Sequence, residues 1–154
     1  MKRPKRLIIL IVILCATIGF IWIHSMMPQS VSSDESNAVM DFIKPFLEIF
    51  VGKGNVTQHL VRKLAHFTEY TALGVELGLL FSRIKKRFVW KNYPLILVHA
   101  VCVAFIDETI QIFSGRGPAV SDMWIDVSGA ALGSAAVLLI VMIIRRTEKN
   151  KREE

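Results

Sequence analysis

The chain has 154 residues, of which 53% are hydrophobic, and it carries a formal net charge of +6. In a soluble protein such a charge would indicate nucleic-acid binding, but here the basic residues stand between four long apolar segments. Each segment approaches the roughly 20 residues that an α-helix needs to cross the hydrocarbon core of a bilayer. We therefore exclude nucleic acid as a partner and predict one all-α domain, residues 1–154, that spans the lipid bilayer.

Four transmembrane helices are predicted, and they cover residues 7–23, 64–81, 93–113 and 125–144. Fourteen of the 19 lysines and arginines lie before the first helix, between the second and third, or in a basic tail at residues 145–154. The positive-inside rule assigns such basic segments to the cytoplasm. The pattern predicts a multi-pass protein of the cell membrane with both termini in the cytoplasm.

The first apolar segment, with its basic start, also resembles a signal peptide. No small-residue cleavage site follows it, so we interpret it as an uncleaved transmembrane helix. Trp22 and His24, near its end, are expected at the membrane interface. Cys15 and Cys102 fall within the first and third helices and are interpreted as small apolar packing residues.

Between the first and second spans lie a predicted loop and a predicted amphipathic helix. The loop contains Pro28 and a serine-rich run that ends at Ser36. The helix covers residues 35–51, with apolar residues at helical spacing, and Pro45 predicts a kink or a break within it. We expect this helix on the outer side, either in contact with lipid or packed over the end of the bundle.

A polar stripe runs along the second transmembrane helix. Residues one turn apart share a helix face, and this arc contains Arg62, His66, Glu69, Leu73 and Glu76. Ionisable side chains inside hydrocarbon are costly, so the stripe is expected to face protein or water. Glu76 lies deeper than the others and is interpreted as a protonated or hydrogen-bonded acid outside the site.

Polar residues also gather near the outer end of the third helix. Asp107, Glu108 and Gln111 lie on a common arc, whereas His99 points to the opposite side. We therefore leave His99 out of the group and assign it a structural role.

The fourth helix adds Asp122 and Asp126, which are one turn apart. Gly129 and Gly133 continue the same face, and small residues at this spacing allow another helix to approach closely. This contact would form either within one bundle or between copies in an oligomer.

The topology brings these polar residues to one layer. Because a helix rises 1.5 Å per residue, the three helices deliver them to similar depths in the outer half of the membrane. We predict an outward-facing pocket with cationic side chains above it; its members are Arg62, Lys63, His66, Glu69, Asp107, Glu108, Gln111, Arg116, Asp122 and Asp126. The alternative is a structural network of ion pairs, but seven polar positions at one depth exceed what one or two ion pairs require.

Three sequence blocks resemble the VanZ-like family of small bacterial membrane proteins. They are RKLAHFTEYTALG at residues 62–74, DETIQIFSGRGPAVSD at 107–122 and DMWIDVSGAALG at 122–133. At Asp126 many relatives carry Asn, so the role of this charge is left open. The resemblance implies a place in the bacterial cell envelope and a link to tolerance of the glycopeptide teicoplanin, which acts at cell-wall precursors outside the membrane. It implies no substrate.

We favour a binding function, in which the pocket holds a lipid-linked or anionic envelope component such as a cell-wall precursor. Arg62, Lys63 and Arg116 would bind its phosphate or carboxylate groups. A third role, as a subunit that modulates another membrane enzyme, is also compatible with the sequence.

The alternative is an intramembrane hydrolase or transferase that acts on a phosphate-containing lipid. His66, Glu69 and Glu108 are the catalytic candidates. His66 and Glu69 would begin a metal site completed by Asp107, Glu108, Asp122 and Asp126, or His66 would act as a general base. The metalloprotease motif HExxH is absent from the sequence, and the sequence identifies neither a metal nor a cofactor.

Overall fold

The computed structural model describes residues 3–84, 90–115 and 120–153 of the chain. Its elements are α1 (Arg3–Met26), α2 (Gln29–Val51), α3 (Gln58–Ile84), the short 3₁₀ helix η1 (Trp90–Asn92), α4 (Tyr93–Phe113) and α5 (Val120–Glu153). All the described elements are helical, which confirms the predicted all-α fold class.

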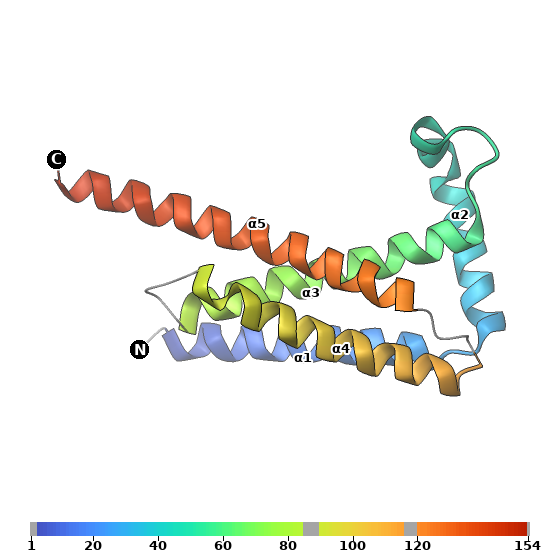
Figure 1. Ribbon diagram of the computed structural model, residues 1–154, viewed down its shortest axis with the longest axis horizontal. Coiled ribbons are helices and arrows are strands. Elements are labelled where there is room, and N and C mark those ends of the chain that lie inside the picture. The colour runs from blue at the N-terminus through green and yellow to red at the C-terminus, as the bar shows by residue number, and fades with distance from the viewer. Residues whose placement is uncertain (1–2, 85–89, 116–119, 154) are drawn as a thin grey trace.

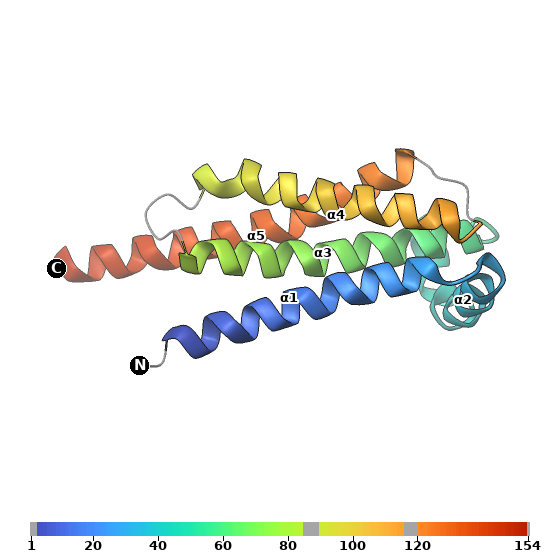
Figure 2. The same ribbon diagram turned by 90° about the horizontal axis from the view of Figure 1, so that it is seen from below.

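Four long helices lie side by side, and α2 stands across one end of them (Figure 1). Helices α1 and α4 run in the direction opposite to α3 and α5, as the perpendicular view in Figure 2 also shows. The last turns of α1 and α4 and the first turns of α3 and α5 therefore meet at the end where α2 lies, which we call the α2 end. Both chain termini lie toward the opposite end.

Within the described residues, three helical segments are long and apolar enough to cross a membrane. They are Lys5–Met26, Trp90–Phe113 and Val120–Arg152. Helix α3 is not among them, because His66, Glu69 and Glu76 interrupt its apolar sequence. Three of the four predicted spans are thus supported by length and composition. The fourth, α3, is a long helix of the same bundle, but its sequence is too polar to meet this criterion.

Helix boundaries agree with the prediction at α4 and differ elsewhere. The predicted loop before residue 35 is wrong, because α2 begins at Gln29, directly after Pro28 at the N-cap position (φ −55°, ψ 150°). Pro45 lies inside α2 without ending it, although its ring removes one intrahelical hydrogen bond. Helix α5 continues through the basic tail to Glu153.

The core is centred on α3, whose Tyr70 and Leu73 are completely buried. Side chains from the three neighbouring long helices pack around this centre, namely Ile21, Ile96, Ala100, Ala104, Ala130 and Leu138. The outward faces of these neighbours are also apolar; Ile9, Phe105 and Ile140 are each more than half exposed. A surface with so many exposed apolar side chains suits lipid better than water.

Helices α3 and α5 touch backbone to backbone at a seam of glycines. A Cβ atom added to Gly133 would collide with the carbonyl oxygen of Thr71, and one added to Gly74 would collide with the backbone of Ala130. Gly129 lies equally close to α3. The Gly129 and Gly133 face therefore packs inside a single chain, which is one of the two contacts that the sequence allowed.

Two side-chain hydrogen bonds connect distant parts of the bundle. Thr17 Oγ1 on α1 donates to Glu76 Oε1 on α3 at 2.7 Å, so Glu76 is a hydrogen-bonded acid, as predicted. Arg145 Nη2 on α5 donates to the carbonyl oxygen of Ser82 at 2.9 Å. That carbonyl belongs to the last turn of α3, where carbonyl groups have no partner within the helix.

Candidate functional site

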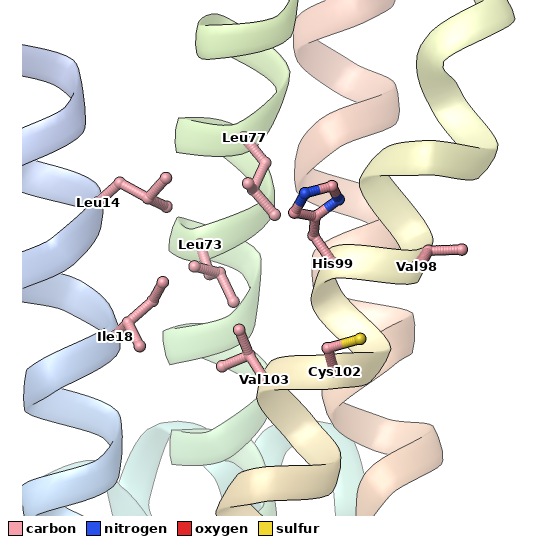
Figure 3. A pocket seen from close by; sticks show the side chains of 8 residues that line it. All are labelled: Leu14, Ile18, Leu73, Leu77, Val98, His99, Cys102 and Val103. Atoms are coloured by element: carbon pink, nitrogen blue, oxygen red, sulfur yellow. The ribbon is translucent and has the colours of Figure 1, made fainter.

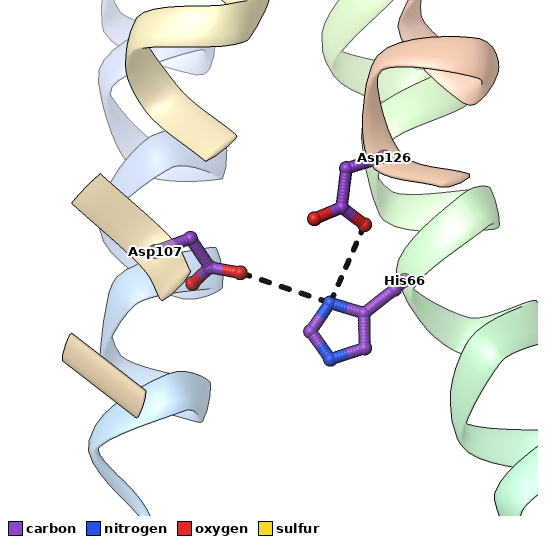
Figure 4. Close-up of side chains that lie close together, drawn as sticks. All are labelled: His66, Asp107 and Asp126. Carbon is purple, nitrogen blue, oxygen red and sulfur yellow. Dashed lines mark ion pairs between the residues drawn. The ribbon is translucent and has the colours of Figure 1, made fainter. Parts of the chain in front are cut away.

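Three buried polar side chains from three different helices point toward one another near the α2 end (Figure 4). His66 comes from α3, Asp107 from α4 and Asp126 from α5. His66 Nδ1 lies 3.7 Å from Asp107 Oδ2 and 3.7 Å from Asp126 Oδ1. His66 is 7% exposed and both aspartates are 0% exposed. We call these three residues the His–Asp cluster.

The helix ends explain why the cluster forms. His66 lies eight residues after the start of α3, Asp126 lies six after the start of α5, and Asp107 lies six before the end of α4. At 1.5 Å per residue, these positions are about 9 to 12 Å from the helix ends that meet at the α2 end. The antiparallel arrangement therefore brings the three residues to similar depths, as the sequence predicted.

Gln111 supports the cluster from one turn further along α4. Its Nε2 donates to Asp107 Oδ2 at 3.2 Å, and both side chains are buried. Glu108, which follows Asp107 in the same helix, is 8% exposed. The buried part of α4 at this level thus carries two carboxylates and an amide, each of which was predicted as a site residue.

Glu69 lies apart from the cluster and pairs with α1. Its Oε1 is 3.4 Å from His24 Nδ1, and the His24 ring centroid is 6.5 Å from that of His66. Among the ion pairs of the described residues, Glu69 pairs with His24, whereas His66 pairs with Asp107 and Asp126. The sequence interpretation placed His24 at the membrane interface and did not include it among the site residues, but the structure sets its ring next to Glu69 and His66.

Tyr70 is a second residue that the sequence interpretation missed. It follows His66 by one helical turn, so the periodicity that defined the polar stripe also includes it. Its side chain is completely buried, and its hydroxyl has no hydrogen-bond partner within the described part of the chain.

The predicted cationic residues occupy the edge of the site. Lys63 Nζ lies 3.4 Å from Asp122 Oδ1, and both side chains are partly exposed. Arg62 Nη2 donates to His59 Nδ1 at 3.2 Å, on the first turns of α3. Arg116 lies outside the residues that the structure describes.

The electrostatic balance of the site is acidic. Its predicted members contain five carboxylate side chains, those of Glu69, Asp107, Glu108, Asp122 and Asp126. Among the described residues, Lys63 pairs with one of these carboxylates, that of Asp122. Such a site attracts cations and hydrogen-bond donors, whereas an anion would need a positive charge between itself and the acids.

An apolar groove lies next to the cluster, between α1, α3 and α4 (Figure 3). Its cavity measures about 220 Å³ and is lined by Leu14, Ile18, Leu73, Leu77, Val98, His99, Cys102 and Val103. Val103 precedes Asp107 by one turn, so the groove begins about 6 Å along α4 from the cluster. An amphiphile has a polar head and an apolar chain, and these two parts match the polar cluster and the apolar groove beside it.

His99 lines this groove and takes no part in the cluster. Its Nδ1 lies 2.7 Å from the carbonyl oxygen of Leu95, in the preceding turn of α4. Its ring packs edge-on against Phe81, with centroids 5.5 Å apart. These contacts agree with the structural role assigned to it.

Comparison with known proteins supports the family resemblance. The sequence model of the VanZ/LLP1 family matches residues 8–144. No curated protein and no solved structure matches the chain. The family match begins in α1 and ends in α5, and it includes all three residues of the His–Asp cluster. The chain therefore belongs to the VanZ/LLP1 family of helical membrane proteins.

Proposed function

We propose that the protein spans the bacterial cell membrane four times, with both termini in the cytoplasm and the α2 end outside. The described basic residues support this orientation, because the start of α1, the end of α3, the 3₁₀ helix η1 and the last turns of α5 lie at the end of the bundle opposite to α2. The fourth span is α3. His66 is buried, Glu69 pairs with His24 of α1, and Glu76 accepts a hydrogen bond from Thr17 of α1, so these side chains face the bundle rather than lipid.

In this orientation α2 lies in the outer membrane interface. Its apolar residues Phe42, Phe46, Ile49 and Phe50 are each more than 60% exposed in the isolated chain. A helix with such a face, lying across the end of the bundle, suits the boundary between head groups and acyl chains. Helix α2 would thus set the depth of the outward-facing site.

The site binds a lipid-linked component of the cell envelope. The observation that carries this proposal is the placement of the buried His–Asp cluster directly beside the apolar groove. A polar head would reach the cluster while a single acyl or prenyl chain follows the groove between α1 and α4. Burial of that chain is favourable, at about 25 cal/mol for each Å² of apolar surface removed from water.

Charge divides the roles of the site residues. The carboxylates of Asp107 and Glu108 accept hydrogen bonds from sugar hydroxyl or ammonium groups of the head. Arg62 and Lys63, at the outer edge, bind its phosphate groups, and Arg116 is assigned the same role. A cell-wall precursor carries all of these groups on one molecule.

Lipid mass spectrometry on protein purified gently with its native lipids tests this proposal. We expect a specific phosphate-bearing lipid with the wild type, and its loss from Glu108→Gln, which removes a buried charge without changing the side-chain shape. Asp41→Asn, on the exposed surface of α2, serves as the charge-matched control and should retain the lipid. The same bulk phospholipids in all three preparations would contradict the proposal.

A groove-filling variant tests the position of the chain. Val103→Phe would occupy the end of the cavity nearest the His–Asp cluster with a larger apolar side chain. We expect it to reduce the copurified lipid while leaving the polar cluster in place. Leu132→Phe, on the exposed face of α5, is the matched control.

A second candidate function is hydrolysis or group transfer at the lipid phosphate. The observation that favours it is His66 Nδ1, which faces a carboxylate on either side. A carboxylate next to histidine orients the ring and supports its action as a general base. Incubation of the wild type with the copurified lipid would release a product in this case, and His66→Ala would abolish the release. Lipid recovered unchanged from the wild type would leave binding as the function.

We extend the proposal to teicoplanin tolerance, because the drug and the proposed site share the outer surface of the membrane. A deletion strain should become more sensitive to teicoplanin, and a wild-type copy should restore tolerance. If Glu108→Gln restores tolerance as fully as the wild-type copy does, tolerance does not depend on the site.

A further inference from the structure

We propose that His66, Asp107 and Asp126 bind one divalent transition-metal ion. Each residue offers one ligand atom, and these atoms all lie within 4.8 Å of one another. They come from α3, α4 and α5, so the ion would connect three helices at the α2 end (Figure 4). The role of this ion in lipid binding rests on the proposed function, whereas the metal site itself does not.

The distances within the cluster suit an ion better than direct hydrogen bonds. His66 Nδ1 is 3.7 Å from an oxygen of each aspartate, and hydrogen bonds from nitrogen to oxygen measure about 2.7 to 3.2 Å. Two ligands at about 2.1 Å from one ion, at the tetrahedral angle, are about 3.4 Å apart. Small side-chain movements would therefore bring all three ligand atoms into contact with an ion.

Asp126 is an independent indication of a ligand. Its side chain is 0% exposed, and neither carboxylate oxygen has a hydrogen-bond partner within the described part of the chain. A buried carboxylate usually accepts several hydrogen bonds, because burial without them costs several kcal/mol. The ion pair with His66 compensates only part of this charge, and a metal ion would supply the rest.

The neighbouring charges favour a divalent ion. Glu108 adds a third buried carboxylate to those of Asp107 and Asp126. Gln111 holds Asp107 Oδ2 through its amide, in the way that outer groups orient metal ligands.

The ligand set selects the class of metal. One imidazole nitrogen with two carboxylate oxygens suits Zn²⁺ or Mn²⁺, while Ca²⁺ and Mg²⁺ prefer oxygen ligands alone. Three protein ligands leave at least one coordination position open. A phosphate oxygen of the lipid head would occupy that position, and the metal ion would thereby allow an anion to approach an acidic cluster.

Titration of the purified, lipid-stripped protein with Mn²⁺ or Zn²⁺ tests the site without any lipid. We expect one ion per chain in the wild type and at least about 100-fold weaker binding in His66→Ala, which loses a direct ligand, and weaker binding in Asp126→Asn, which replaces a carboxylate ligand with a neutral amide. His59→Ala, which removes an exposed histidine of α3, is the matched control and should bind as the wild type does. Wild-type affinity in His66→Ala would overturn the proposal.

A second measurement uses the wild type alone and remains decisive where the variants fail to fold. Electron paramagnetic resonance of bound Mn²⁺ should show coupling to one imidazole nitrogen, which disappears when the protein is labelled with ¹⁵N-histidine and a ¹⁵N pattern replaces it. A wild-type protein that binds no ion, or a bound ion without nitrogen coupling, would contradict the site. If the wild type binds the ion but copurifies with no specific lipid, the metal site stands and the proposed lipid function is refuted.

Discussion

Gly133 on α5 lies against the carbonyl oxygen of Thr71 on α3, with no room for a side chain between them. Helices in a membrane gain little from hydrophobic association, because lipid tails are as apolar as their side chains, so close packing and interhelical hydrogen bonds hold them together. The seam formed by Gly74, Gly129 and Gly133 therefore attaches α3, whose apolar sequence is interrupted by polar residues, to α5. It also fixes the relative position of His66 and Asp126.

A side chain added within this seam should destabilise the protein. Gly133→Ala places a methyl group on a backbone that cannot retreat without separating the helices, and we expect a loss of about 1 to 3 kcal/mol. Gly19→Ala is the control, because no atom lies within 4 Å of the added carbon. Thermal unfolding in detergent measures both. Equal midpoints for the two variants would contradict the packing of the seam.

The hydrogen bond from Arg145 to Ser82 should stabilise the end of α3. Arg145→Gln shortens the side chain and leaves the carbonyl of the last turn without this donor, at an expected cost of about 1 kcal/mol. Arg146→Gln, on the exposed side of the same helix, removes an equal charge and should have little effect. Hydrogen exchange of the amides before Ile84 should increase only in Arg145→Gln.

The contact between Thr17 and Glu76 should hold α1 in the bundle. Thr17→Val keeps the shape of the side chain but removes the donor to Glu76 Oε1, and we expect a loss of about 1 to 2 kcal/mol. Thr68→Val removes an exposed hydroxyl that donates only within α3, to Leu64, and provides the control. Unfolding midpoints that shift equally would show that the interhelical bond contributes nothing.

Thiol labelling tests the proposed orientation. In a background with Cys15→Ala and Cys102→Ala, we expect Lys53→Cys, exposed near the α2 end, to react with a membrane-impermeant reagent on intact cells. Asn150→Cys, exposed near the end of α5, should react only after the membrane is permeabilised. The reverse pattern would place the candidate site on the cytoplasmic side.

Much of the helical layout follows from local sequence patterns. The apolar run predicts α4 at residues 93–113, and Pro94 in the first turn and Ser114 at the C-cap agree with these ends in the structure. The face of α5 that approaches α3 follows from Gly129 and Gly133. Helical periodicity also places His66, Asp107 and Asp126 at similar depths.

The pairings within the site depend on information that one helix does not contain. His66 and Glu69 share an arc of α3, yet His66 faces α4 and α5 while Glu69 faces His24 on α1. Periodicity defines a face, but the neighbour of that face depends on how the helices are arranged in space. The start of α2 was missed for a related reason, since its serine-rich sequence has the composition of a loop and tertiary context overrides helix propensity.

The three ligands of the His–Asp cluster are unequally constrained. The glycine seam sets the position of His66 relative to Asp126, because the α3 and α5 backbones already touch and cannot move closer. Asp107 belongs to α4, which contributes no glycine to this seam. Any sliding or rotation of α4 would therefore change the distance from Asp107 to the other two residues, whereas the seam holds the distance between His66 and Asp126.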